Sequence, residues 1–546
     1  MPREEIQIEG VPFDINLLVK QLKQDMRDDW FPDPLNYEDV LKAEVITKKF
    51  AEYKKSNNKP YNGFEARQYN IPKQGFVLRY ALEMSLWDRI IYQGIAKYLI
   101  SFCDHHLSTS VFSHRWTGKP NSKYIFRQPI DAWKQFQNAI KVNLSSENPW
   151  LVVTDVQNFF ENIRINDVEV CLNQVLSQSK LSPRDTERTG RAVKILKRLL
   201  TKWTPYGQHG IPQNRDSSSF IGNMIMHNVD RVMLDKGYIY YRYMDDIRLI
   251  CRDEFHARRA LKELIIELRK VGLNVNSKKS FIVSKDSEQI EEYIFKPDRE
   301  IEQIDALWKT KRLFDVRKSL PLLRKMTLQL IANDQTQERR FRFCINRLEQ
   351  IARCKETRNS FDFSKITDTV IAELINQPYS TDSFVRYLKC VDLTKTQLKS
   401  LFTILTDSSK NIYSWQNYHL WQLLVNHNFR SDILIQAAKD SIGPSIAEPN
   451  VAGAILYLGA CGDDTDKAWI AGQFNNFRSY IVQRHAMVAT HELDYKKYVK
   501  PLMQEYVRED LKGTYRTLAT SYRGTYYRPL EPVSVTEIYR NIPAYD

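Results

Sequence analysis

Two adjacent acids, Asp245 and Asp246, have the residue types and spacing of a metal-binding catalytic pair. Neighbouring carboxylates repel each other, so such a pair is costly unless a divalent cation neutralises it. The aromatic run at 238–243 precedes the pair and an apolar run at 247–251 follows it, which predicts two short strands joined by a tight turn. Paired acids carried by strands are what a two-metal phosphoryl-transfer site requires.

A third acid, Asp155, is expected to reach the same site from another strand. It follows the apolar run 150–154, and a strand holds the side chain at its end rigidly. The three aspartates are therefore predicted to converge on two metals roughly 4 Å apart, one acting on a primer 3′-hydroxyl and the other on a triphosphate. Any one of these acids alone would more often be a turn or cap residue.

The composition favours a folded, multidomain protein that binds a polyanion. A chain of 546 residues is too long for one core, so about two to four domains are expected. The formal net charge of +14 predicts attraction to nucleic acid, and a merely basic protein is the alternative. Seven scattered cysteines without CxxC spacing argue against a zinc site and a disulfide framework, and they favour a cytoplasmic location. The longest apolar run, 451–461, is too short to cross a membrane.

The apolar pattern divides the first part of the chain into an N-terminal extension at 1–60 and an alternating region at 61–300. A helix is predicted at 37–53, and helices at 167–178 and 257–271 alternate with the short strands. This order predicts a small α+β palm. The chain lacks GxGxxG and GxxxxGK[ST] sequences, which argues against the Rossmann and P-loop classes.

Beyond residue 300 only helical spacing is evident. Residues 301–360 form a basic, thumb-like region, and 361–546 are predicted to be an all-α domain with helices at 415–425, 432–441 and 468–489. Loops separate these segments at intervals of roughly 20 to 35 residues, as in an α-solenoid. No clear sequence repeat is present, so an irregular helical bundle is an equal alternative.

The chain resembles a reverse transcriptase through five motifs that occur in the family's order between about 75 and 285. The fingers motif is Pro72-Lys73, Arg79 and Asp88-Arg89-Ile90-Ile91; the palm motifs are Thr154-Asp155-Val156-Gln157-Asn158-Phe159-Phe160, Gly210-Ile211-Pro212-Gln213 with Ser218, Asn223 and Asp230, Tyr243-Met244-Asp245-Asp246, and Gly272-Leu273 with Asn276 and Lys279. The resemblance implies a right-hand polymerase, with fingers and a ferredoxin-like palm sheet joined to the C-terminal helices.

By this resemblance Asp155, Asp245 and Asp246 are the catalytic, metal-binding acids, and the Val156 carbonyl adds an oxygen ligand. The implied cofactor is a pair of Mg²⁺ ions, with Mn²⁺ as a substitute. Lys279 is the implied proton donor to the departing pyrophosphate, although the adjacent lysine could serve instead.

The resemblance also assigns a nucleotide-binding group. Phe160 is the implied steric gate against a ribose 2′-hydroxyl, and ordinary core packing is its alternative role. Lys73 and Arg79 are the implied triphosphate-binding cations, and each alone would be a solvated surface residue. Gln213 is expected to position the incoming nucleotide.

One position departs from the family pattern. The second palm motif usually ends in glycine, which lets the backbone approach template or nucleotide closely, but Asn214 occupies that place here. Asparagine tolerates a left-handed backbone conformation and adds a side chain. Template handling is therefore expected to differ.

Two basic stretches support binding of nucleic acid. They comprise Arg188, Arg191, Lys194, Lys197, Arg198 and Lys202 within the palm region, and Lys309, Lys311, Arg312, Arg317, Lys318, Arg324 and Lys325 in the thumb-like region. Of these, Arg312, Arg317 and Lys318 are the predicted contacts to a primer–template backbone. Solvated charged helices are the alternative. Arg478 and His485 have a spacing similar to that in helical ribonuclease domains, but the stronger expectation is that residues in such a helix pack or face solvent.

The long helical tail narrows the resemblance to prokaryotic antiviral reverse transcriptases of the abortive-infection and unknown-group types, whose palms are retron- and group II intron-like. Such enzymes imply dNTP substrates, an RNA template that is in some cases a companion non-coding RNA, a DNA product and a homo-oligomer without membrane attachment. Two alternatives stay open. One is a template-independent or protein-primed nucleotidyltransferase, for which Tyr522, Tyr526 and Tyr527 are candidate primers. The other is a catalytically silent nucleic-acid-binding scaffold.

Overall fold

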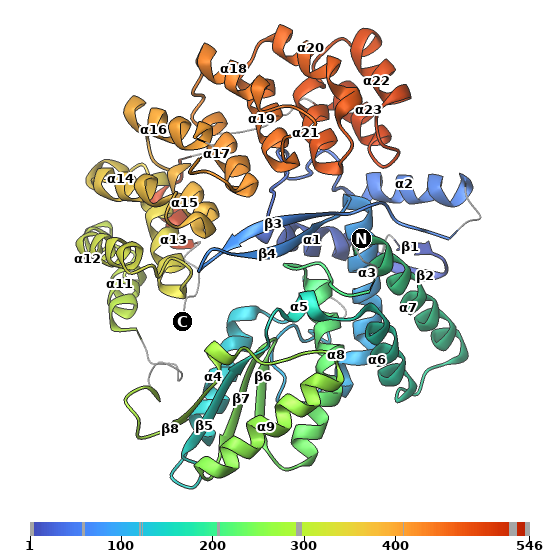
Figure 1. The fold of residues 1–546 in the computed structure, drawn as a ribbon, viewed down its shortest axis with the longest axis vertical. Helices are drawn as coiled ribbons and strands as arrows, with labels where there is room; N and C mark the ends of the chain where they lie inside the picture. The colour runs from blue at the N-terminus through green and yellow to red at the C-terminus, as the bar shows by residue number, and fades with distance from the viewer. Residues whose placement is uncertain are drawn as a thin grey trace.

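A computed structural model describes most of the chain and divides it into an α+β half and a helical half. The described residues are 5–56, 60–119, 122, 124–204, 208–290, 298–407, 409–522 and 532–540. Figure 1 shows the palm sheet at the bottom, the C-terminal helices in an arc across the top and left, and a β-hairpin between them. Tyr526 and Tyr527, two of the candidate priming residues, lie outside the described residues.

The N-terminal elements precede the palm in the chain. They are β1 (Glu5–Ile8), β2 (Val11–Asp14), α1 (Ile15–Asp25), η1 (Met26–Asp28), α2 (Ala43–Ser56), β3 (Arg67–Lys73), β4 (Val77–Glu83) and α3 (Leu86–Cys103). The helix predicted at 37–53 is wrong at its start, because α2 begins only at Ala43. Asn36 and Tyr37 have positive φ angles of 49° and 54°, and the Asp33 carboxylate accepts a hydrogen bond from the Tyr37 amide, so the chain turns there instead.

The palm is a four-stranded antiparallel sheet in the order β6-β7-β5-β8. Its strands are β5 (Trp150–Asp155), β6 (Ile239–Tyr243), β7 (Asp246–Cys251) and β8 (Phe281–Ser284), and its helices are α4 (Pro129–Asn143), α5 (Phe159–Asn162), α6 (Ile165–Ser177), α7 (Pro183–Trp203), α8 (Asp216–Asp235) and α9 (Glu254–Lys270). The strands predicted around the aspartates are confirmed, and so are the two helices predicted in this region, within three residues at each end.

Strand β5 is buried on both faces, which explains its continuous apolar sequence. Leu151 and Val153 pack with Phe136 of α4 on one face of the sheet, whereas Val152 joins the core of the fingers and palm on the other. A strand held in this way cannot shift its register without exposing apolar side chains. The position of Asp155 at its end is correspondingly fixed.

The second half of the chain forms helices, with no strand among the described residues after β8. These are α11 (Arg299–Lys309), α12 (Leu313–Ala332), α13 (Arg339–Arg353), α14 (Ser364–Glu373), α15 (Thr381–Leu388), α16 (Lys395–Thr406), α17 (Ser414–Asn426), α18 (Asp432–Asp440), α19 (Glu448–Cys461), α20 (Asp464–Gly472), α21 (Tyr480–Thr490), α22 (Lys500–Glu505), α23 (Lys512–Ser521) and α24 (Val535–Arg540). The single helix predicted at 468–489 is wrong. It is two helices, because Ser479 caps the start of α21 by accepting a hydrogen bond from the Val482 amide.

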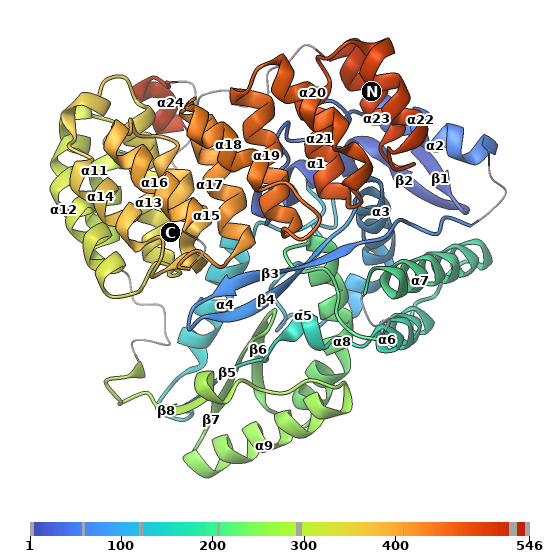
Figure 2. The ribbon, with the colours of Figure 1, turned by 45° about the horizontal axis from the view of Figure 1, so that its top comes forward.

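One apolar core runs through the helical half from Ile304 to Ile538, and it also takes in part of the fingers. Trp30, Phe31 and Ile71 belong to this core. The β3–β4 hairpin therefore packs beneath the C-terminal helices, as Figure 2 shows from a second direction. All seven cysteines lie in described segments and are free thiols. No helix in the described residues is long and apolar enough to cross a membrane.

Candidate active site

The three predicted acids come together at one end of the palm sheet. Asp155, the last residue of β5, lies opposite Asp246, the first residue of β7, in the antiparallel ladder. Asp245 occupies the preceding turn, and its carbonyl accepts a hydrogen bond from the Val156 amide at 3.1 Å. The predicted convergence of two strands on one site is thus present in the backbone.

The turn between β6 and β7 has a conformation that places Asp245 at its tip. Met244 is buried and has a positive φ of 57°, an unfavourable conformation for most side chains. The guanidinium of Arg242 holds it in place by donating to the Met244 carbonyl at 2.9 Å. Arg242 is fully buried and pairs with Asp230 at 2.7 Å, so it does not neutralise the aspartate pair.

Negative charge is in excess at this point. Burial and the neighbouring acids Asp155 and Asp246 raise the pKa of Asp245 to about 7. Burial also raises the pKa of Asp246, whereas Arg248 at 3.6 Å opposes that rise. Lys279 lies 3.2 Å from Asp155. Two of the three acids therefore have a cation beside them.

The donor set suits a hard divalent cation, because carboxylate and carbonyl oxygens are the ligands that Mg²⁺ prefers. In the described part of the chain no three His, Cys, Asp or Glu side chains are already gathered around one point that would hold a metal ion. Asp155 and Asp246 are turned instead toward Lys279 and Arg248. Ion binding at this site would exchange those cations for the metal.

The fourth motif is attached directly to the Asp155 strand. The Asn276 amide donates to the Asp155 carbonyl at 2.7 Å, and Val156 forms a β-bridge with Val275. Gly272 precedes this segment with a φ of 74°, so it supplies the left-handed residue that ends α9. These backbone bonds explain how Lys279 reaches the acids.

The two fingers cations approach the acids from the β3–β4 hairpin. Burial lowers the pKa of Arg79, while Glu161 and Asp245 act in the opposite direction. Burial, with the positive charges of Arg79 and Lys279, lowers the pKa of Lys73. The charge of Asp155 thus acts on Lys73, and the charge of Asp245 acts on Arg79.

Phe160 and Gln213 are joined by a residue that the sequence did not single out. Phe160 lies half-buried in α5, with its ring 5.1 Å from that of Phe159. The next residue, Glu161, accepts a hydrogen bond from the Gln213 amide at 3.0 Å and from the Tyr80 backbone amide at 3.4 Å. The only signal for Glu161 in the sequence is its place next to the predicted gate.

Comparison with protein families agrees with this geometry. A model described as "Reverse transcriptase (RNA-dependent DNA polymerase)" matches residues 71–343, half of the chain. The chain belongs to the reverse transcriptase family. The description of this family names the activity of RNA-directed DNA polymerases, which are nucleotidyltransferases. Among curated proteins, none matches the chain.

Solved telomerase structures share limited similarity with this reverse transcriptase. Apo telomerase from Candida tropicalis is 12% identical, with 87% of this chain and 73% of that chain covered and a TM-score of 0.33. Telomerase from Candida albicans with a fragment of telomeric RNA is 10% identical, with 71% and 68% covered and a TM-score of 0.31. This chain spans 55% of the C. tropicalis apo telomerase truncated from its C-terminal domain, which is 14% identical over 45% of this chain with a TM-score of 0.30. Similarity this low supports no functional conclusion.

Several motif residues of the reverse transcriptase have structural roles. Asn223 is buried and accepts from Arg242 at 3.0 Å while donating to the Ser113 carbonyl at 2.9 Å. The Ser218 hydroxyl lies 2.8 Å from that of Tyr92. The second palm motif therefore fixes α8 against the fingers and against the turn that carries the aspartates.

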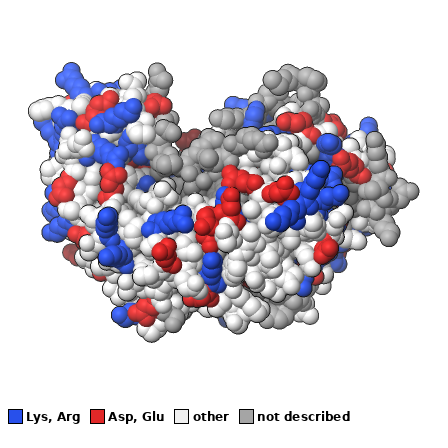
Figure 3. All heavy atoms as spheres, turned by 90° about the horizontal axis from the view of Figure 1, so that it is seen from above, with Lys and Arg blue, Asp and Glu red and all other residues white. Residues whose placement is uncertain are grey.

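The two basic stretches differ in their surroundings. On α7, Arg191 pairs with Glu187, Lys197 with Glu169 and Arg198 with Glu9, so these charges are partly neutralised within the protein. In the thumb-like region Arg312, Arg317 and Lys318 are exposed at the start of α12. Their contacts to the protein are looser, because Lys318 lies 3.8 Å from Asp315 and Arg317 donates to the Glu356 carbonyl at 3.1 Å. Figure 3 shows that the face at the top of Figure 1 mixes cations and acids, so the positive charge does not gather there.

The two residues with the ribonuclease-like spacing lie in different surroundings, since Arg478 is exposed before the start of α21 and His485 is packed within that helix. His485 is buried, and its ring bonds the Tyr418 hydroxyl at 2.9 Å and the Ile481 carbonyl at 2.7 Å. Burial lowers the pKa of His485 to about 4, so the ring is neutral at physiological pH. The neighbouring Arg484 is also buried and pairs with Asp33 and Asp39.

Proposed function

We propose that the chain is an RNA-directed DNA polymerase that adds deoxynucleotides to a primer hydroxyl with two divalent ions, Mg²⁺ or in its place Mn²⁺. The observation that carries this proposal is the opposition of Asp155 and Asp246 in the β5–β7 ladder, with Asp245 in the adjoining turn. Acids on the ends of rigid strands are well suited to hold metal ions at a fixed spacing.

Asp155, Asp245, Asp246 and the Val156 carbonyl would hold the ions. Bound divalent ions stabilise the charge that develops on attacking and leaving oxygens. Lys279 would give a proton to the departing pyrophosphate, since its ammonium lies 3.2 Å from Asp155 and its side chain is 61% exposed. An exposed ammonium beside the acids is placed to reach a leaving group there.

The incoming dNTP would bind between the fingers hairpin and α5. Lys73 and Arg79 would contact its triphosphate, because both lie close enough to the acids for Asp155 to act on the pKa of Lys73 and Asp245 on that of Arg79. The Phe160 ring would fill the space of a 2′-hydroxyl. Gln213, held by Glu161, would position the nucleotide.

Arg312, Arg317 and Lys318 would contact the phosphates of the primer–template duplex, because they are exposed and begin the helix that follows α11. Contacts of this kind bind without base specificity and weaken with salt. The template would be RNA, including a companion non-coding RNA, and the product would be DNA.

The biological role we propose is antiphage defence by a cytoplasmic homo-oligomer. Support comes from an intact set of acids joined to a long helical region, which we propose is a solenoid-like domain that begins at about 361. The division into an extension at 1–60, a fingers and palm region at 61–300 and a thumb at 301–360 stays a prediction.

One experiment tests the activity and its template together. The protein is expressed, and both the nucleic acid that co-purifies with it and the nucleic acid that it synthesises are sequenced, with the Asp245→Ala/Asp246→Ala variant as control. A DNA product complementary to a bound RNA supports the proposal. A homopolymer made without template favours the template-independent or protein-primed alternative. If the unaltered protein makes no product, the polymerase proposal fails and the catalytically silent nucleic-acid-binding scaffold is the alternative that stays open.

A further inference from the structure

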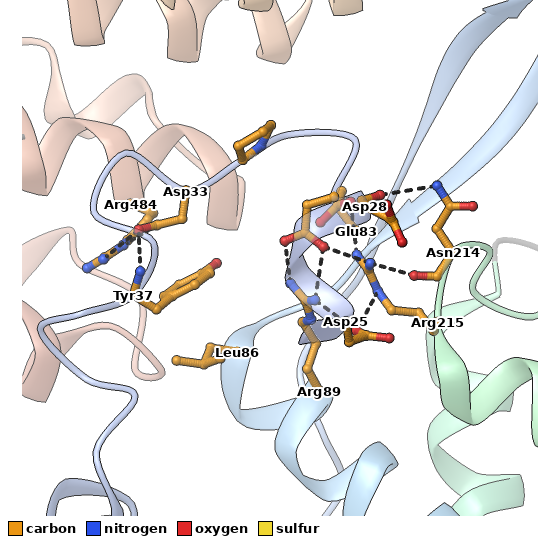
Figure 4. Close-up of polar contacts among 12 residues, drawn as sticks. Asp25, Asp28, Asp33, Tyr37, Glu83, Leu86, Arg89, Asn214, Arg215 and Arg484 are labelled. Carbon is orange, nitrogen blue, oxygen red and sulfur yellow. Dashed lines mark hydrogen bonds and ion pairs between the residues drawn. The ribbon is translucent and has the colours of Figure 1, made fainter. Parts of the chain in front are cut away.

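Residues 25–39, which we call the brace, connect the nucleotide-binding loop to the C-terminal helices. Figure 4 shows Asn214 and Arg215 at one end of the brace and Arg484 at the other. We propose that the brace positions the loop 210–215 for the incoming nucleotide, and that the C-terminal helices hold the brace in place. This inference rests on the polymerase activity proposed above.

At the loop end, Asn214 uses the side chain that distinguishes it from glycine. Its amide donates to the Asp28 carbonyl at 3.1 Å, and its backbone has a positive φ of 53°. Glycine would adopt this conformation more easily but could not form the bond. The departure from the family motif therefore has a structural consequence, which is a tether between the loop and the brace.

The next residue, Arg215, ties the loop to the brace by charge. Its buried guanidinium donates to Asp29 at 2.8 Å and to the Asn214 carbonyl at 2.9 Å. Arg89 of α3 holds the same Asp29 at 2.7 and 2.9 Å and also reaches Asp25 at 3.1 Å. Buried charge pairs of this kind are costly to break, because an unpaired charge is left behind.

At the far end, Arg484 binds the brace through all three nitrogens of its guanidinium. It donates to Asp33 at 2.7 and 3.1 Å and to Asp39 twice at 2.7 Å. Its side chain is 1% exposed, and the Asp33 and Asp39 side chains are 3% and 0% exposed. This end of the brace cannot move without α21.

Helix α17 holds the middle of the brace through backbone carbonyls. Trp415 donates to the Trp30 carbonyl at 2.8 Å, and Tyr418 donates to the Pro32 carbonyl at 2.6 Å. The Gln422 amide adds a second bond to Pro32 at 3.3 Å. These donors come from one helix face, so the brace is fixed along its length rather than at one point.

The brace also touches the fingers cation. The guanidinium of Arg79 lies 5.3 Å from the centre of the Trp30 ring. Gln213, next to Asn214, bonds Glu161 beside the predicted gate. The brace therefore contacts both Arg79, which would bind the triphosphate, and the loop that would position the nucleotide.

The first test removes the tether without adding strain. Asn214→Gly keeps an easy left-handed backbone and deletes only the side-chain bond, so KM for dNTP should rise about three- to tenfold with little change in kcat. Hydrogen exchange over 208–216 should quicken as well. Asn428→Gly is the matched control, because Asn428 also has a positive φ, 46°, but lies in the turn between α17 and α18, outside both the loop and the brace. Unchanged KM and unchanged exchange in Asn214→Gly would overturn the proposal.

The second test asks whether the C-terminal helices act on the loop through the brace. Tyr418→Phe removes the hydroxyl that bonds both the Pro32 carbonyl of the brace and the His485 ring of α21, the helix that carries Arg484. It should raise KM for dNTP in the same direction. Tyr457→Phe is its control, because that hydroxyl bonds the Phe429 carbonyl outside the brace at 2.8 Å. The Asn214→Gly/Tyr418→Phe double variant should show less than the product of the two single effects. If the effect of the double variant on KM equals the product of the two single effects, the two ends of the brace act independently.

The two proposals can fail separately. If the unaltered protein incorporates no nucleotide, the polymerase proposal fails, but hydrogen exchange still tests the brace. Tyr418→Phe should then quicken exchange over 208–216, and Tyr457→Phe should not. If incorporation is normal and exchange in Tyr418→Phe is unchanged, the brace proposal fails while the polymerase proposal stands.

Discussion

The ammonium of Lys279 lies 3.2 Å from a carboxylate oxygen of Asp155, so a candidate proton donor and a candidate metal ligand neutralise each other. Likewise, a guanidinium nitrogen of Arg248 lies 3.6 Å from a carboxylate oxygen of Asp246. Asp245 differs from these two acids, because burial and its acidic neighbours raise its pKa to about 7. The acids are therefore not equivalent, and substitutions should separate their effects on folding from their effects on chemistry.

Asp245→Asn should abolish nucleotide incorporation and make the protein more stable. The amide removes a repulsive charge, which should raise the free energy of unfolding by on the order of 1 kcal/mol at pH 8. Loss of a metal ligand should lower the rate by about a thousandfold or more. Primer extension and thermal unfolding measure the two effects. An active Asp245→Asn variant would remove this residue from the site.

Phe160→Ala should weaken discrimination against ribonucleotides. Removing the ring opens the space of a 2′-hydroxyl, so the preference for dNTP over NTP should fall about ten- to a hundredfold. Competing incorporation of the two sugars measures the preference. Phe159→Leu is the control, because Phe159 is buried in the core and its loss should lower stability without changing sugar preference. An unchanged preference in Phe160→Ala would assign Phe160 to packing alone.

The sequence predicted where the acids lie better than it predicted the residues that support them, for a physical reason. Asp155 and Asp246 follow from local alternation, because strands and turns depend on neighbouring residues. Glu161 and the brace depend on pairs far apart in the chain, such as Asp33 with Arg484, 451 residues away. A lone buried arginine in an apolar helix does not reveal its partner.

Helix boundaries illustrate the same limit. The spacing of apolar residues predicts one helix at 468–489, because Phe474 and Phe477 continue the apolar pattern. These rings instead lie in the turn between α20 and α21 and pack into the core, 5.7 Å apart. Tertiary packing thus stabilises a break that the local pattern does not show.

Glu83 should make stability depend on pH near neutrality. Burial raises its pKa to about 7 from 4.5, although Arg215 and Arg89 oppose that rise and the acids Asp25 and Asp29 add to it. Because the folded pKa lies above the unfolded value, this contribution is complete below about pH 4.5 and is lost as pH rises through 7. Its size is on the order of 2 kcal/mol.

Glu83→Gln should therefore flatten the stability profile between about pH 4.5 and pH 7, the range that the shift in pKa spans. Chemical unfolding at several pH values measures this, with Glu263→Gln as control, because nearby Lys236 lowers the pKa of that partly exposed acid below its usual value. An equally steep profile in Glu83→Gln would place the titration on another group.

Substitution of the exposed cations at the start of α12 should reduce the salt dependence of nucleic-acid binding. Replacing Arg312, Arg317 and Lys318 with Gln should lower the slope of log K against log salt by about 0.7–0.9 for each phosphate that the protein no longer neutralises, or roughly two to three in total. Binding of an RNA–DNA duplex at several salt concentrations measures the slope. Arg191→Gln/Lys197→Gln on α7 is the control, because acids pair with both of those cations at 2.5 and 2.6 Å, closer than the 3.8 Å between Lys318 and Asp315. If the control changes the slope and the α12 variant does not, the duplex lies along α7 instead.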